Sequence, residues 1–122
     1  GISMELAEVK RRFCELADMD ELAGERFHRL AEISCFGIEQ NRKKMKTTLQ
    51  QELLLTQLAA TDLYCRYLML KQQDFSSMRV ADVQIQGGMQ TDRLATAKQL
   101  YLELLKQCKD LLQDVEFLFR RM

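Results

Sequence analysis

The sequence predicts an all-α fold: an elongated antiparallel bundle of three or four helices, two of them long, with coiled-coil-like packing. The first observation is composition, because the 122 residues include no proline and only five glycines, which suits long helices better than loop-rich sheets. The second is that apolar residues, 47% of the chain, are enough for a core. They also recur at spacings of three and four, as on one helix face. The length favours a single domain over residues 1–122.

Two shorter helices are predicted at the N-terminus, near 4–17 and 19–36. The first carries an apolar stripe made up of Leu6, Val9, Phe13 and Leu16. Asp18 and Glu21 have the spacing of a capping box, which predicts a break near residue 18. Because the apolar stripe keeps its heptad register beyond this point, one continuous helix is the alternative. Gly37 predicts a second break, since glycine weakens a helix by roughly 1 kcal/mol relative to alanine.

A long central helix is predicted from about 40 to 73. Its apolar residues form two seams, one of Leu49, Leu53, Thr56, Ala60, Leu63, Tyr67 and Leu70, the other of Leu54, Leu58, Cys65, Leu68 and Met69. A helix that is apolar on two faces needs neighbours on both sides. The segment 74–91 contains paired serines and Gly87-Gly88, so it predicts a connection. Alternation of apolar and polar residues over 81–85 suggests a short strand within it.

A second long helix is predicted from 92 to 121, with Thr91 as its N-cap. Its heptad a positions are Leu94, Tyr101, Cys108, Val115 and Met122, and its d positions are Ala97, Leu104, Leu111 and Leu118. Apolar residues at the e positions make the stripe wider than a two-stranded coiled coil requires. We expect this helix to pack first on the segment 49–70. Its surplus edge is then expected to bind a partner through Leu105, Leu112, Phe119 and Met122.

The length of these two helices predicts an elongated molecule. At 1.5 Å per residue they would be about 45–50 Å long, whereas a compact domain of this size has a diameter of roughly 35 Å. Either the molecule is a rod, or the helices extend into a partner. A two-fold homodimer would bury the extra apolar surface.

Charge is balanced overall but unevenly distributed. The chain has 18 basic and 18 acidic residues, yet residues 1–40 are acidic and residues 41–73 are basic. This predicts pairing between the two segments, within the chain or across a dimer. The basic residues that could contact phosphate or an acidic partner are Arg42, Lys43, Lys44 and Lys46. Nucleic-acid-binding segments usually interleave aromatic side chains with such charge, and this run has none.

No residue pattern predicts a catalytic, cofactor or metal site. The four cysteines are widely spaced: Cys14, Cys35, Cys65 and Cys108. Zinc sites need close ligand pairs, so we expect reduced cysteines on helix faces, with Cys14 and Cys35 nearer the surface. Glu25 and His28 have the Glu-x-x-His spacing of di-iron bundles, which need a second copy on a facing helix. Gly87-Gly88 lacks the Lys-Ser/Thr that completes a phosphate-binding loop.

The function expected from these observations is non-enzymatic: an adaptor, assembly subunit or small chaperone that binds protein through an apolar helix face. The partner is another protein or a second copy, with a homodimer favoured. The alternative is a dimeric nucleic-acid-associated regulator that uses the basic segment 42–46. The chain lacks a run of 18 apolar residues, so no membrane partner is predicted, and no small-molecule substrate or cofactor is indicated. Four cysteines without a secretion signal favour a reducing compartment, the cytoplasm rather than the nucleus.

Overall fold

Helices account for nearly all of the chain that the computed structural model describes. It describes residues 5–76 and 80–120, with the backbone alone at 72–76, 80–91, 117, 119 and 120. The helices are α1 (Leu6–Ala17), α2 (Glu21–Gly24), α3 (His28–Asn41), α4 (Leu49–Ser76), α5 (Val80–Gln107) and α6 (Val115–Arg120), with 3-10 turns η1 (Glu25–Phe27) and η2 (Lys109–Leu111). The all-α bundle predicted from the sequence is confirmed.

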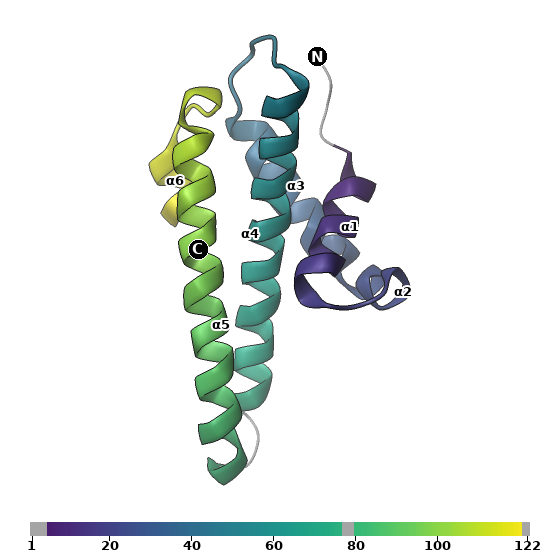
Figure 1. Ribbon diagram of the computed structural model, residues 1–122, viewed down its shortest axis with the longest axis vertical. Helices are drawn as coiled ribbons and strands as arrows, with labels where there is room; N and C mark the ends of the chain where they lie inside the picture. The colour runs from purple at the N-terminus through teal and green to yellow at the C-terminus, as the bar shows by residue number, and fades with distance from the viewer. Residues whose placement is uncertain (1–4, 77–79, 121–122) are drawn as a thin grey trace.

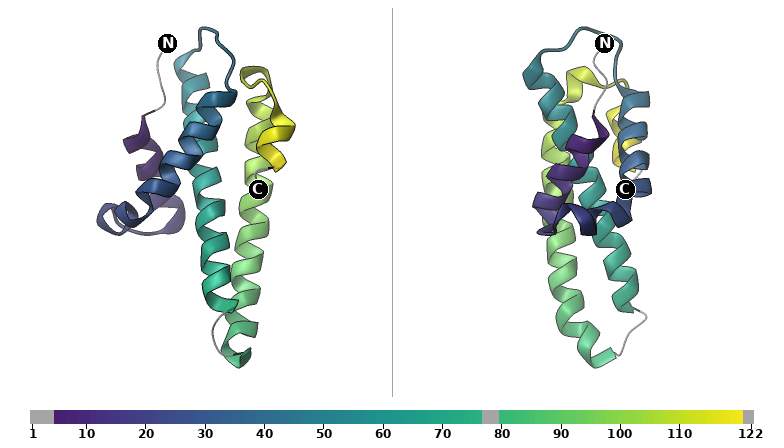
Figure 2. Two further views of the ribbon diagram at one scale, coloured as in Figure 1. Left: turned by 180° about the vertical axis from the view of Figure 1, so that it is seen from behind. Right: turned by 90° about the vertical axis from the view of Figure 1, so that its right-hand side faces the viewer.

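The axis of the molecule is an antiparallel hairpin of α4 and α5 (Figure 1). Each of these helices has 28 residues and is therefore about 42 Å long. The shorter helices lie against the half of the hairpin where α4 begins, and α6 folds back beside α5 at that same end (Figures 1 and 2). The other half of the hairpin extends beyond them, so the molecule is elongated.

Helix α4 is the central helix, as its two apolar faces predict. It contacts α1, α3 and α5. Its buried apolar residues are Leu55, Leu58, Ala59, Ala60, Leu63, Cys65 and Leu68, and those of α5 are Leu94, Ala97, Tyr101, Leu104 and Leu105. The expectation that the C-terminal long helix packs on the central helix of its own chain is confirmed.

Three aromatic rings join the N-terminal helices to α4. Phe13 of α1 and Phe27 of η1 each meet Tyr67 of α4 edge to face, with ring centroids 5.5 Å and 5.1 Å apart. Phe13 and Phe27 also meet each other edge to face at 5.8 Å. Edge-to-face pairs contribute beyond the area they bury, so this cluster fixes α1 and η1 on the central helix.

The two N-terminal helices are separate, as the break near residue 18 predicts. Asp18 ends α1 in a left-handed conformation, with φ 54° and ψ 52°. The next helix is capped by Asp20 and not, as predicted, by Asp18: the Asp20 carboxylate accepts a hydrogen bond from the N–H of Ala23 at 2.7 Å. Spacing alone does not distinguish two neighbouring aspartates that both suit a cap. Gly24 lets α2 approach α1 closely, because a Cβ there would lie 2.3 Å from the Cys14 Sγ.

The boundary between α3 and α4 differs from the prediction. Helix α3 continues through Gly37 to Asn41, and α4 begins at Leu49 instead of near residue 40. A penalty of about 1 kcal/mol for glycine is too small to end a helix packed on the core. The start of α4 is a capping box: the Thr48 hydroxyl accepts from the Gln51 N–H at 3.2 Å, and the Gln51 side chain accepts from the Thr48 N–H at 2.8 Å.

The connection predicted over 74–91 is wrong, because most of this segment is helical. Helix α4 continues to Ser76, and α5 already begins at Val80. A lone strand over 81–85 would leave its N–H and C=O groups unpaired, whereas a helix pairs them internally. Gly87-Gly88 weakens the helix by about 1 kcal/mol per glycine, and α5 continues for 28 residues in spite of it.

The single helix predicted from 92 to 121 is also wrong, because it ends after Gln107. The turn η2 follows, and Leu112 is extended, with φ −118° and ψ 146°. Helix α6 then folds back along the molecule (Figure 2), where the Tyr101 hydroxyl donates to the carbonyl of Leu118 at 3.2 Å. The coiled-coil register therefore does not continue through residues 108–118 as one helix.

Contacts with the end of α3 hold this turn. The Asn41 side chain accepts from the N–H of Asp114 at 2.7 Å and donates to its carbonyl at 3.1 Å. The N–H of Gln113 donates to the carbonyl of Asn41 at 2.7 Å, and the N–H of Lys43 donates to the carbonyl of Leu111 at 2.8 Å. These partners lie far apart in the sequence, so the heptad pattern could not reveal the break.

Candidate interaction surface

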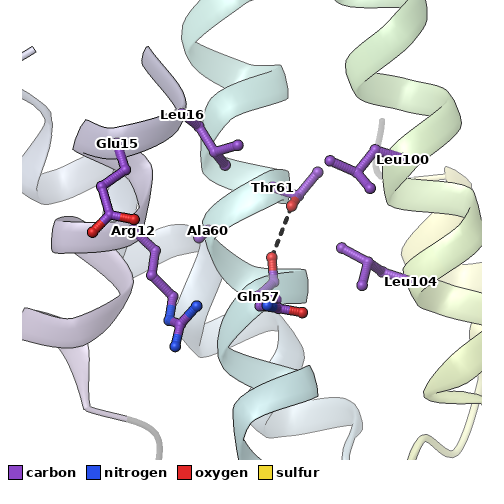
Figure 3. Close-up of a pocket in the computed structure, with 8 residues that line it drawn as sticks. All are labelled: Arg12, Glu15, Leu16, Gln57, Ala60, Thr61, Leu100 and Leu104. Carbon is purple, nitrogen blue, oxygen red and sulfur yellow. Dashed lines mark hydrogen bonds between the residues drawn. The ribbon is translucent and has the colours of Figure 1, made fainter. Parts of the chain in front are cut away.

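A groove of about 290 Å³ runs along α4 between α1 and α5. Its floor is α4, and the side chains of the two flanking helices point into it from either side (Figure 3). We call it the α4 groove. Its lining residues are Arg12, Glu15 and Leu16 of α1, Gln57, Ala60 and Thr61 of α4, and Leu100 and Leu104 of α5.

The floor of the α4 groove exists because two small residues follow each other on α4. Ala60 and Thr61 are both buried, and neither is long enough to fill the space between the flanking helices. The Thr61 hydroxyl donates to the carbonyl of Gln57 at 2.8 Å (Figure 3). Its polar group is thus satisfied within the helix, which leaves the floor suited to an apolar ligand.

Leucines from three helices are exposed at this surface. Leu16 of α1 is 38% exposed and Leu100 of α5 is 42% exposed, and both line the groove. Leu53 of α4 is 39% exposed and lies one turn before Gln57 on the same helix face. Single exposed leucines are ordinary, and a groove flanked by exposed leucines is a candidate interaction surface.

Charged residues form the rim on the α1 side. Arg11 pairs with Glu8 and, at 2.7 Å, with Glu15. Arg12 Nε lies 3.4 Å from Glu8 Oε1, but this buried nitrogen makes no hydrogen bond with its neighbours in the described residues. The rim therefore consists of charged side chains that are paired with one another or held beside one another along α1.

Two of the four residues of the apolar edge predicted on the C-terminal helix are buried within their own chain. Leu105 and Leu112 are only 1% and 2% exposed, because the chain turns after Gln107 and the two leucines join the core of their own chain. The side chain of Phe119 and the whole of Met122 lie outside the described residues. The heptad pattern did not identify Leu100 as a surface residue of interest. An apolar residue outside the main heptad stripe was the only indication that the sequence offered.

The residues of the basic segment 42–46 lie in two different environments. Arg42 is half-buried and bonds to Glu52 and, at 3.1 Å, to Glu39. It is therefore engaged within the protein and is not presented to phosphate, contrary to the sequence prediction. Lys43, Lys44 and Lys46 are exposed as expected. Glu39 belongs to the acidic segment 1–40 and Arg42 to the basic segment 41–73. Their ion pair therefore connects the two segments at the point where they meet.

Glu52 has an altered pKa because of this arrangement. Burial acts to raise the pKa of its carboxyl group, but hydrogen bonds from Arg42 and Thr47 outweigh burial and hold the pKa below its ordinary value. The carboxylate thus stays charged in mild acid. It joins the two ends of the loop between α3 and α4.

The cysteines do not form a reactive centre. Cys14, expected near the surface, is buried, and Cys35 is half-buried. Burial raises the pKa of Cys65 to about 12 and that of Cys108 to about 11. A thiol with such a pKa is protonated at neutral pH and is a poor nucleophile.

Glu25 and His28 contact a lysine. Lys10 of α1 pairs with Glu25, and its Nζ lies 3.1 Å from His28 Nδ1. The ammonium group of Lys10 thus takes the position that a metal ion bound by Glu25 and His28 would occupy. Among the described residues, no group of three or more His, Cys, Asp or Glu side chains is placed to hold a metal ion.

Across the same described ranges, no helix is both long enough and apolar enough to cross a membrane. Comparisons with protein-family models, curated proteins and solved structures find no match to this chain.

Proposed function

We propose that this chain is a non-enzymatic interaction protein, an adaptor, assembly subunit or small chaperone, that binds a partner helix in the α4 groove. The observation that supports the proposal is that Leu16 of α1 and Leu100 of α5 remain exposed on the two sides of one groove with a floor of small side chains. An amphipathic helix docks into such a groove with apolar residues spaced three and four apart.

The partner helix belongs either to a second copy of the chain or to another protein. A homodimer is the first case to test, because two-fold dimers are the commonest oligomers and need only one self-complementary surface. The four free cysteines are compatible with the reducing compartment that we propose, the cytoplasm.

The test places carboxylates at both sides of the α4 groove. In Leu16→Glu/Leu100→Glu, two exposed leucines are replaced, so the fold should persist while docking of an apolar helix face is lost. Leu70→Glu is the matched control, because Leu70 is 44% exposed on α4 but lies outside the groove. Sedimentation velocity reports self-association, and affinity capture from the native host followed by mass spectrometry reports other partners.

We expect the complex formed by the wild type, whether with itself or with another protein, to be retained by Leu70→Glu and lost in the double variant. Circular dichroism confirms that both variants are folded. The proposal is refuted if the wild type is monomeric at every concentration and the double variant captures the same proteins as the wild type.

A further inference from the structure

The loop between α3 and α4 carries a second surface feature, at one end of the molecule. Its four consecutive residues Lys43, Lys44, Met45 and Lys46 are all exposed; we call them the KKMK tip. The loop lies at the outer end of the helical hairpin in each view, where α4 begins (Figures 1 and 2). The KKMK tip therefore projects from the molecule, unlike the residues of the α4 groove.

The protein holds both ends of the KKMK tip in place. Arg42 before it and Thr47 after it hydrogen-bond to the same oxygen of Glu52. The backbone N–H of Lys43 is held by the carbonyl of Leu111 at 2.8 Å. Because the residues on either side are fixed by these bonds, the four side chains between them are presented together to solvent.

The KKMK tip carries positive charge that its surroundings do not balance. Arg42 shares its one positive charge between the carboxylates of Glu39 and Glu52, which leaves one formal negative charge beside the three lysines. No acidic residue lies between Gln40 and Gln51 in the sequence. The surface thus favours an anionic partner.

Exposed apolar side chains accompany the lysines. Met45 is 46% exposed, and Leu49, in the first turn of α4, is 77% exposed. An anionic bilayer offers both chemistries that this surface needs, charged headgroups at its surface and apolar chains just below. Proteins that bind single-stranded nucleic acid usually combine such charge with aromatic stacking, and the KKMK tip has no aromatic residue.

We propose that the KKMK tip docks on an anionic lipid surface. Lys43, Lys44 and Lys46 contact the headgroups, while Met45 and Leu49 enter the interface between headgroups and acyl chains. Contact of this kind requires no membrane-spanning helix. The attachment is weak and reversible, and it leaves the α4 groove accessible along the side of the molecule.

The first experiment measures co-sedimentation with vesicles. The full chain is mixed with vesicles of phosphatidylcholine alone, or of equal parts phosphatidylcholine and phosphatidylglycerol, at low and high salt. We expect binding to the anionic vesicles only, weakened by salt. Each Lys→Gln change in the KKMK tip should reduce partitioning about fivefold. Lys71→Gln is the matched control, an exposed lysine about 33 Å further along α4 than Leu49, and it should bind as the wild type does.

A second experiment tests whether Met45 enters the interface. The chain contains no tryptophan, so Met45→Trp provides a single fluorophore, and Leu70→Trp provides one far from the KKMK tip. Anionic vesicles should shift the emission of Met45→Trp to shorter wavelength and protect it from an aqueous quencher. The emission of Leu70→Trp should not change.

Several results would overturn the proposal. They are equal binding to neutral vesicles, no binding to anionic vesicles, or full binding by the triple variant Lys43→Gln/Lys44→Gln/Lys46→Gln. Salt-sensitive binding of single-stranded nucleic acid without any vesicle binding would assign the KKMK tip to a polynucleotide instead. Because all three lysines are exposed, loss of folding is not expected to obscure the result, and circular dichroism checks this.

Discussion

Single polar residues set the points at which helices begin and end. Asp18 adopts the left-handed conformation that ends α1, which aspartate tolerates better than most residues. Thr48 and Gln51 cap α4 through each other's backbone. Asn41 differs from these, because its side chain bonds to a residue 73 positions away. Local caps can be read from a sequence, whereas the partner of Asn41 cannot.

Glu52 should make the stability of the protein dependent on pH. Its pKa is lower in the folded protein than in the unfolded chain, so its contribution is complete above the ordinary value of about 4.3. That contribution is lost as the pH falls through the lower pKa of the folded state. At neutral pH, Glu52→Gln should reduce the free energy of unfolding by about 1–3 kcal/mol, because it removes charge-assisted hydrogen bonds.

Chemical denaturation at a series of pH values checks this prediction. The free energy of unfolding of the wild type should fall more steeply than that of Glu52→Gln below about pH 4, so that the two proteins converge in acid. Glu103→Gln, at an exposed position on α5, is the control and should follow the wild type. Parallel curves for the wild type and Glu52→Gln would show that the carboxylate is not coupled to folding.

Among the elements, α6 depends most on contacts from elsewhere in the chain. It has six residues, too few to form a stable helix alone. It is held by the buried side chain of Leu118 and by the hydrogen bond from Tyr101 to the carbonyl of Leu118. The turn before it is held by Asn41.

Asn41→Ala should release this turn and α6 while leaving the α4–α5 hairpin intact. The substitution removes the acceptor of the Asp114 N–H and one of the donors to the Asp114 carbonyl, which should cost about 1–3 kcal/mol. Hydrogen exchange should show faster exchange over residues 108–120 and little change over 50–70. Gln40→Ala, at the exposed neighbouring position, should exchange as the wild type does. Unchanged exchange in Asn41→Ala would mean that packing alone holds the turn.

The whole molecule is a rod whose two halves are built differently. In one half the α4–α5 hairpin is covered by the N-terminal helices and α6, and in the other it extends alone (Figure 1). The KKMK tip lies at the covered end, and the α4 groove runs along the side. A rod with distinct surfaces at its end and on its side suits a protein that holds two partners at once.

Thiol reactivity should report opening of the whole structure. Cys65 and Cys108 are fully buried, and burial raises their pKa to about 12 and about 11, respectively. Burial also raises the pKa of Cys35 to about 11, so exposure sets the order of reaction. With iodoacetamide at neutral pH, the half-buried Cys35 should be modified first. Cys65 and Cys108 should react no faster than the protein unfolds. Mass spectrometry of digested samples measures the order of modification, and early modification of Cys108 would instead show that the C-terminal turn opens locally.

Helix content and the central position of α4 follow from the spacing of apolar residues, because helical periodicity is a local property of the chain. The stripe from Leu6 to Leu16 and the two seams of α4 were sufficient to predict an all-α hairpin with neighbours on both sides. The same reasoning misjudged 74–91, since serines and glycines lower helix propensity by amounts that a long helix tolerates.

Three features that carry the functional proposals arise only from contacts between distant residues. Asn41 breaks the C-terminal heptads, and that break buries Leu105 and Leu112 in the core. Glu52 binds Arg42, so that within the basic segment only Lys43, Lys44 and Lys46 are left exposed. The α4 groove needs side chains from three helices at once, with leucines from α1 and α5 on either side of small residues of α4. Burial and pairing depend on which residues meet in space, and spacing along the chain does not contain that information.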